Sequence, residues 1–176
     1  MGTEGIKLQL DSLRPLSQAQ NLQAHCCSFA NIAMTTATAL QHTDPAPAAG
    51  ILLLTHEEIG NALITAAKHV MPRLPCQLDT LELGANDDPS AMLPAAARAA
   101  RALDRGGGVL VLSDLYGSTP CNIANKLAGL GVRARCVSGL NLPMLLRVLN
   151  YPDKPLDELA EVAASGGRGG ICIDKV

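Results

Sequence analysis

Short continuous runs of apolar residues begin at residue 50, and each run ends at polar residues. The run at 50–54 stops at Thr55 and His56, and the run at 109–112 is followed closely by Asp114. Uninterrupted apolar runs of this length are typical of strands that are buried on both faces. With two further apolar segments, they predict strands at residues 50–54, 76–83, 109–114 and 132–140.

Between these runs, apolar residues recur every three or four positions, which is the spacing of a helix with one buried face. Proline close to the start of a segment, as in Asp88-Pro89-Ser90, favours a helix N-terminus. The expected helices cover residues 57–70, 88–103, 118–130, 141–149 and 156–164.

Strands that alternate with helices predict an α/β fold, a doubly wound and mostly parallel sheet of about four strands with helices on both faces. The glycine-rich stretch at 166–170 is expected to separate the last helix from a short strand at 171–173, placed at an edge of the sheet.

Residues 1–48 have a different character from the rest of the chain. They mix Gln, Ser, Thr and Ala with a Pro and Ala string, and they show no sustained strand or helix period. We interpret 1–48 as an N-terminal extension or linker and 49–176 as the folded domain. A short helix at 8–22, or a true start at Met34, are alternatives that the sequence leaves open.

Composition narrows the possible partners. The formal net charge of −2 and the absence of Trp argue against a nucleic-acid partner. No apolar run approaches the roughly 20 residues that a membrane span needs, and no signal peptide is evident, so a cytoplasmic protein is expected. The six cysteines form no C-x-x-C pair, and of the histidines only His25 lies beside cysteines, at Cys26 and Cys27, so neither a metal nor a cofactor is expected.

Candidate chemistry lies where the expected strands end, because open α/β sheets bind ligands at the carboxyl ends of their strands. His56 offers a ring nitrogen that can attack phosphorus, and Asp114 could fix the tautomer of that ring. The helix start at Gly117, Ser118 and Thr119 offers N–H groups and hydroxyls to phosphoryl oxygens. Each of these residues could also have a purely structural role, ending a strand or capping a helix. Only their combination favours phosphoryl transfer.

The motifs around these residues resemble the IIA proteins of the mannose family of the sugar phosphotransferase system. The similar segments are Ile51-Leu52-Leu53-Leu54-Thr55-His56, Val111-Leu112-Ser113-Asp114-Leu115-Tyr116-Gly117-Ser118-Thr119-Pro120, Gly139-Leu140-Asn141-Leu142-Pro143-Met144 and Ser165-Gly166-Gly167-Arg168-Gly169-Gly170-Ile171. Their order and spacing match over about residues 49 to 173. The chain departs from the family at Glu57, where a small residue is common, and at Leu115, where a hydroxyl residue is common.

The resemblance implies a phosphotransferase component that forms a phosphohistidine. His56 would accept a phosphoryl group from the phosphocarrier HPr, Asp114 would orient its ring, and the loop at Gly117, Ser118 and Thr119 would bind the phosphoryl group. Asn141 and Pro143 would belong to a supporting loop. The family also implies a homodimer in which the final strand crosses to the partner's sheet.

The resemblance leaves the physiological role open. The phosphoryl group could pass to a separate IIB protein, with the membrane reached only through a IIC/IID complex, or the phosphorylated protein could act as a regulator. A flavodoxin-like module that binds a small phosphorylated ligand without covalent transfer is the alternative function. A hydrolase that uses Ser118 or Cys121 is a third possibility, although the sequence contains no G-x-S-x-G motif of such enzymes.

Overall fold

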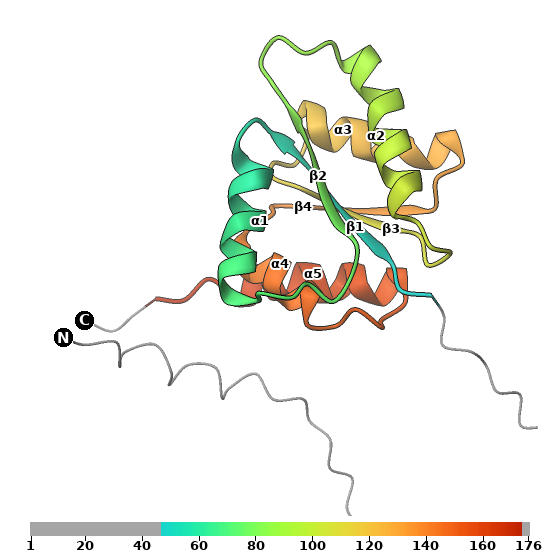
Figure 1. The fold of residues 1–176 in the computed structure, drawn as a ribbon. Helices are drawn as coiled ribbons and strands as arrows, with labels where there is room; N and C mark the ends of the chain where they lie inside the picture. The colour runs from blue at the N-terminus through green and yellow to red at the C-terminus, as the bar shows by residue number, and fades with distance from the viewer. Residues whose placement is uncertain (1–46, 174–176) are drawn as a thin grey trace, which may run out of the picture. The chain divides into compact units, whose positions relative to one another are not determined.

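The computed structural model describes residues 47–173, and residues 1–46 and 174–176 lie outside the described part (Figure 1). The expected extension at 1–48 therefore falls almost entirely outside it, and the domain boundary stays a prediction. The described elements are β1 (Gly50–His56), α1 (Ile59–Val70), β2 (Leu78–Leu83), α2 (Pro89–Leu103), β3 (Val109–Ser113), α3 (Thr119–Lys126), the 3₁₀ helix η2 (Leu127–Leu130), β4 (Ala134–Ser138), α4 (Leu142–Leu149) and α5 (Leu156–Gly169).

The strands form one four-stranded sheet in the order β2-β1-β3-β4, and all three pairings are parallel. β1 and β3 lie at the centre, and Ile51 to Leu54 and Val109 to Leu112 are at most 1% exposed. This explains why both strands are continuously apolar in the sequence, since helices cover both of their faces. The expected α/β fold with a parallel sheet of four strands is confirmed.

Two layers of helices enclose the sheet (Figure 1). α1, α4 and α5 cover one face, where Ile51 and Leu53 of β1 pack with Leu145, Leu149 and their neighbours. α2 and α3 cover the other, where Leu52 and Leu54 pack against the helical alanines. Side chains alternate along β1, so Thr55 lies on the α1 face and His56 on the α3 face.

The C-terminal region differs from the sequence-based expectation. α5 continues through the glycine-rich stretch to Gly169, because the glycines allow α5 to lie close against α4. A Cβ at Gly166 would lie 2.5 Å from Cβ of Arg147, and one at Gly167 would lie 2.7 Å from Cε of Met144. The short strand expected at 171–173 is not formed within this chain, and these residues follow α5 in an exposed segment.

Candidate functional site

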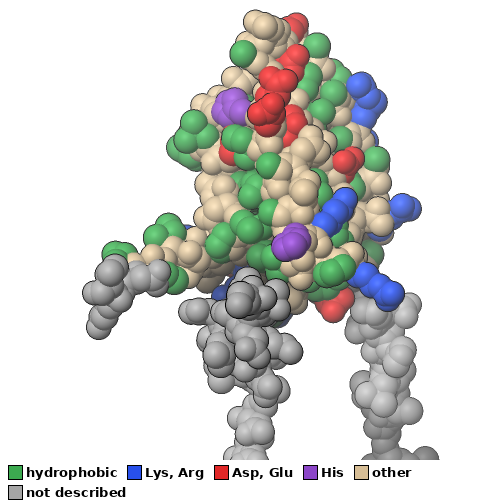
Figure 2. All heavy atoms as spheres, turned by 60° about the vertical axis from the view of Figure 1, so that its left-hand side comes forward, with side chains coloured by type: hydrophobic (Ala, Val, Ile, Leu, Met, Phe, Trp, Pro, Cys, Tyr) green, Lys and Arg blue, Asp and Glu red, His purple; other side chains and the backbone are tan. Residues whose placement is uncertain are grey.

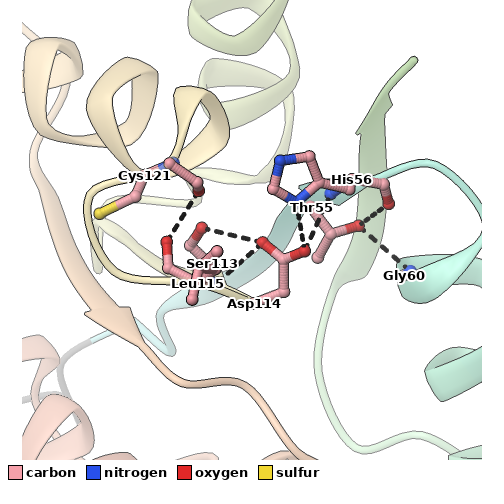
Figure 3. Close-up of polar contacts among 8 residues, drawn as sticks. Thr55, His56, Gly60, Ser113, Asp114, Leu115 and Cys121 are labelled. Atoms are coloured by element: carbon pink, nitrogen blue, oxygen red, sulfur yellow. Dashed lines mark hydrogen bonds and ion pairs between the residues drawn. The ribbon is translucent and has the colours of Figure 1, made fainter. Parts of the chain in front are cut away.

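His56 and Asp114 meet at the carboxyl end of the sheet, as their positions after two apolar runs predicted (Figure 3). β1 and β3 are adjacent parallel strands, so their final residues lie at the same end of the sheet. Nδ1 of the His56 ring lies 2.7 Å from Oδ2 of Asp114, although the two residues are 58 positions apart in sequence. The backbone N–H of His56 donates to the same carboxylate oxygen over 3.2 Å.

This contact assigns different tasks to the two ring nitrogens. A carboxylate only accepts hydrogen bonds, so it holds the proton on Nδ1 and leaves the lone pair of a neutral ring on Nε2. The His56 side chain is 46% exposed, whereas that of Asp114 is 10% exposed. In Figure 3 the second ring nitrogen points away from Asp114. The site therefore presents a nucleophilic nitrogen to the outside and keeps its carboxylate inside.

The Asp114 carboxylate is held in its charged form. Partial burial raises the pKa of Asp114, but the hydrogen bonds and charge of His56 and the N–H of Leu115 outweigh burial and leave this pKa below its usual value. Leu115 donates its backbone N–H to Oδ1 over 2.9 Å. Both carboxylate oxygens thus accept hydrogen bonds from backbone groups, which fixes the carboxylate as well as its charge.

The loop from Leu115 to Thr119 follows Asp114 and leads into α3. Gly117 has a φ of 78°, a left-handed conformation that a side chain would strain. Ser118 is the N-cap of α3, accepting from the N–H of Cys121 over 3.5 Å and donating to the carbonyl of Leu115 over 2.7 Å. Its hydroxyl already has partners, whereas the N–H of Thr119, at the first position of the helix, has no partner within the helix and could donate to an anion.

Asn141 and Pro143 lie at the same end of the sheet, after the neighbouring strand β4 and at the start of α4. Asn141 caps α4 by accepting from the N–H of Met144 over 2.9 Å, and its amide donates to the carbonyl of Gly167 in α5 over 3.3 Å. Within residues 47–173, neither residue forms a hydrogen bond with His56 or Asp114. Their observed contacts cap α4 and join it to α5.

Polar residues surround the turn between His56 and α1, and Glu82 among them was not singled out from the sequence. Thr55 is fully buried, and Glu82 at the end of β2 accepts two hydrogen bonds from Asn61 in the first turn of α1. Glu82 reads in the sequence as an ordinary polar position of a half-exposed strand. The one feature that could have pointed to Glu82 is its position before Leu83, which pairs with His56 in the parallel register.

Acidic residues gather near this edge of the sheet, and Figure 2 shows Asp and Glu side chains clustered beside one of the histidines. The Glu57 carboxylate lies beside Gly84, 3.3 Å from where a Cβ on that glycine would sit. Gly84 follows β2, on the opposite side of β1 from Asp114. The first of the two acids after His56 therefore points away from the His56–Asp114 pair.

Within residues 47–173, no group of three or more His, Cys, Asp and Glu side chains is placed to hold a metal ion. None of the helices in that part of the chain has the length and apolar character to cross a membrane.

Comparison with known proteins places the chain in a family. A model of the family described as the PTS system fructose IIA component matches residues 50–163. The PTS system mannose-specific EIIAB component of Escherichia coli K12 is 35% identical over 71 residues, which are 39% of this chain and 22% of that protein. The chain thus matches only about a fifth of the length of that relative.

Solved structures agree with the family match. The mannose/sorbose-specific IIA subunit from Enterococcus faecalis has a TM-score of 0.66 and 25% identity, with 73% of this chain and 96% of that chain covered. The EIIA component from Streptococcus agalactiae has a TM-score of 0.63 at 20% identity, with 70% and 95% covered, and it supports the fold alone. The resemblance to mannose-family IIA proteins is confirmed, and the chain belongs to the family of phosphotransferase-system IIA components.

Proposed function

We propose that this protein is a phosphohistidine carrier that accepts a phosphoryl group from HPr on Nε2 of His56. The observation that carries the proposal is the 2.7 Å contact between Nδ1 of His56 and the largely buried carboxylate of Asp114. This contact leaves the exposed nitrogen with a lone pair, which is the requirement for attack on phosphorus. Membership of the IIA family supports the same reaction class.

The proposed transfer uses only groups of the two proteins. The Nε2 lone pair forms a bond to phosphorus while the bond from phosphorus to the nitrogen of the donor breaks, and the donor takes back the electron pair. The proton stays on Nδ1, so the His56 ring becomes cationic, and the charged Asp114 stabilises it. Delivery to an acceptor reverses these bond changes. A low pKa of Asp114 suits this role, because the carboxylate stays charged throughout.

The incoming phosphoryl group would lie over the loop between Asp114 and α3. The Thr119 amide and the turn at Gly117 present N–H groups at the start of a helix, where the helix dipole favours negative charge. Ser118 would hold this loop in shape through its bonds to Leu115 and Cys121.

Exposed apolar side chains beside the loop would form the docking surface for protein partners. Leu115 is 60% exposed and Tyr116 is 84% exposed, although both are large and apolar in their greater part. Their position next to the acceptor suits a transfer that needs two active sites to approach closely. The partners proposed here are HPr as donor and a separate IIB protein or regulatory target as acceptor.

We further propose a homodimer in which residues 171–173 of each chain pair with β4 of the other. β4 is an edge strand in the described sheet, and a groove of about 480 Å³ runs beside it between α3 and α5. Ile171 is 76% exposed and Ile173 is 96% exposed, which is unfavourable for a lone chain. Pairing would cover both the open edge and these side chains. A cytoplasmic location fits all of these partners.

Phosphorylation with phosphoenolpyruvate, enzyme I and HPr tests the proposal. Wild-type protein should gain about 80 Da, lost again in acid, because one phosphoryl group is bound through nitrogen. His56→Ala should gain nothing, while the control His69→Ala should be labelled like the wild type. Absence of label on the wild type, with a known IIA protein labelled in parallel, would overturn covalent transfer and leave a non-covalent phosphate-binding module.

A further inference from the structure

The turn that carries His56 has an unfavourable backbone conformation. Glu58 has a φ of 70°, and it is the one non-glycine residue between 47 and 173 with a positive φ. A residue with a long side chain adopts this conformation only when its surroundings hold it there. Glu58 is also the N-cap of α1, and its side chain makes no capping hydrogen bond. The support for this turn must therefore come from other residues.

Thr55 supplies part of that support from inside the protein. Its hydroxyl donates to the carbonyl of His56 over 2.9 Å and accepts from the N–H of Gly60 over 3.2 Å. The Thr55 side chain is fully buried, so its hydroxyl has no water to exchange with. One hydroxyl thus joins the end of β1 to the first turn of α1.

Glu82 supplies the rest from the neighbouring strand. Its two carboxylate oxygens accept from the backbone N–H and the side-chain amide of Asn61, over 2.7 and 2.8 Å. A carboxylate at this place also interacts favourably with the positive end of the α1 dipole. The fit leaves no spare room, since a Cβ at Gly60 would lie 2.1 Å from Oγ1 of Thr80 and 3.2 Å from Oε1 of Glu82.

We propose that Thr55, Asn61 and Glu82 form a turn clamp that positions His56 for phosphoryl transfer. This inference rests on the proposed function of His56. The turn clamp lies on the α1 face of the sheet, whereas the His56 side chain lies on the α3 face, and none of the hydrogen bonds of the turn clamp involves the His56 ring. It acts through the backbone, by holding the His56 carbonyl and the strained residue Glu58 in place.

The turn clamp has a direct consequence for the reacting nitrogen. Without it, Glu58 can relax toward a negative φ, and the backbone of His56 turns with it. The ring and the backbone N–H of His56 share one oxygen of Asp114, so a rotation of the backbone disturbs both bonds together. The ring then spends less time with its proton on Nδ1 and its lone pair directed outward.

Removal of the Glu82 carboxylate tests the turn clamp. Glu82→Leu should lower the maximal rate of His56 phosphorylation about tenfold with little change in KM for HPr, because positioning and not docking is affected. Glu82→Gln should restore most of the rate, since its amide oxygen still accepts from Asn61. Asp79→Leu is the matched control, because it removes a carboxylate of the same strand that accepts a hydrogen bond from the N–H of its neighbour Thr80 and not from α1.

A second variant isolates the role of backbone strain. Glycine adopts a positive φ without cost, so Glu58→Gly in the Glu82→Leu background should recover a large part of the lost rate. Because a glycine at this N-cap can also raise the overall stability, the free energy of unfolding is measured for both variants beside the rate, and a rate that only follows the stability would count against the strain argument.

The state of the His56 ring gives a readout that does not depend on phosphotransfer. The ¹⁵N chemical shifts of the ring should show the tautomer with the proton on Nδ1 in the wild type, in Asp79→Leu and in Glu82→Gln, and a mixture of tautomers in Glu82→Leu. Wild-type shifts and a wild-type rate in Glu82→Leu would overturn the turn clamp. If wild-type His56 accepts no phosphoryl group at all, the proposed function fails, and the ring shifts still decide whether the turn clamp exists.

Discussion

Oδ2 of Asp114 accepts two hydrogen bonds from His56, one from the ring and one from the backbone. The imidazole is therefore fixed relative to its own main chain as well as to the neighbouring strand. Oδ1 of the same carboxylate accepts from the N–H of Leu115. Both oxygens of this carboxylate therefore act as acceptors, and an N–H group could replace neither of them.

Asp114→Asn should slow phosphorylation of His56 about 100-fold, in the range that is typical for loss of a proton-handling group. The NH₂ group of an asparagine must face an N–H donor in either orientation, at His56 or at Leu115. In the first orientation the His56 ring loses its preferred tautomer. In the second, the N–H of Leu115 loses its acceptor. Initial rates by rapid quench measure the effect, with Asp79→Asn as control, and a rate within threefold of wild type would contradict it.

Stability should depend on pH through Asp114. Its pKa is lower in the folded protein than in the unfolded chain, so the unfolded chain binds a proton first as pH falls. The stabilisation is fully present above the unfolded pKa of about 4 and is lost as pH falls through the lower folded value. Urea unfolding between pH 6 and 3 should therefore show a smaller loss of stability in Asp114→Asn than in the wild type. Parallel curves would refute this assignment.

Variants of Ser118 can separate its role as a helix cap from the proposed binding of the phosphoryl group nearby. Ser118→Ala should lower the free energy of unfolding by about 1 kcal/mol, because the N-cap of α3 is lost. Ser118→Asp should keep the cap and most of the stability, while its charge repels the phosphoryl group and reduces labelling. Ser118→Thr is the control that keeps the hydroxyl. Chemical denaturation and HPr-dependent labelling of the three variants measure the two effects, and full labelling of Ser118→Asp would place the phosphoryl group elsewhere.

Gly60→Ala should destabilise the protein by about 1–3 kcal/mol, the usual cost of forcing an extra carbon into a filled space. The added Cβ would meet Oγ1 of Thr80 and Oγ1 of Thr55. Gly129→Ala is a matched control, since nothing lies within 4 Å of the position of its added Cβ. Thermal unfolding of both variants tests this, and equal melting temperatures would show that the first turn of α1 has room to adjust.

The sequence predicted the pairing of His56 with Asp114 because two simple rules combined. Runs that are apolar at every position mark central parallel strands, and parallel strands bring their carboxyl ends to one edge. Neither rule needs knowledge of side-chain contacts. The placement of His56 and Asp114 at one end of the sheet thus followed from the strand ends, whereas their roles in phosphoryl transfer rest on the family resemblance and remain a proposal.

The turn clamp and the end of α5 were not predicted, for opposite reasons. Glu82 contacts Asn61 across 21 positions of chain, and a polar residue in a half-exposed strand looks the same whether it caps a helix or faces water. At Gly166 and Gly167 a local rule gave the wrong answer. Glycine usually weakens a helix, but here close packing against Arg147 and Met144 outweighs that preference.

The separation of His56 and Asp114 along the chain also governs when the site comes into existence. β1 and β3 become neighbours only after the chain has passed through α1, β2 and α2, and pairings between such distant segments form late in folding. A nascent or partly unfolded chain contains the histidine but has no carboxylate beside it. Under the proposed function, a chain would accept a phosphoryl group only after these strands have paired, so labelling would report completed folding.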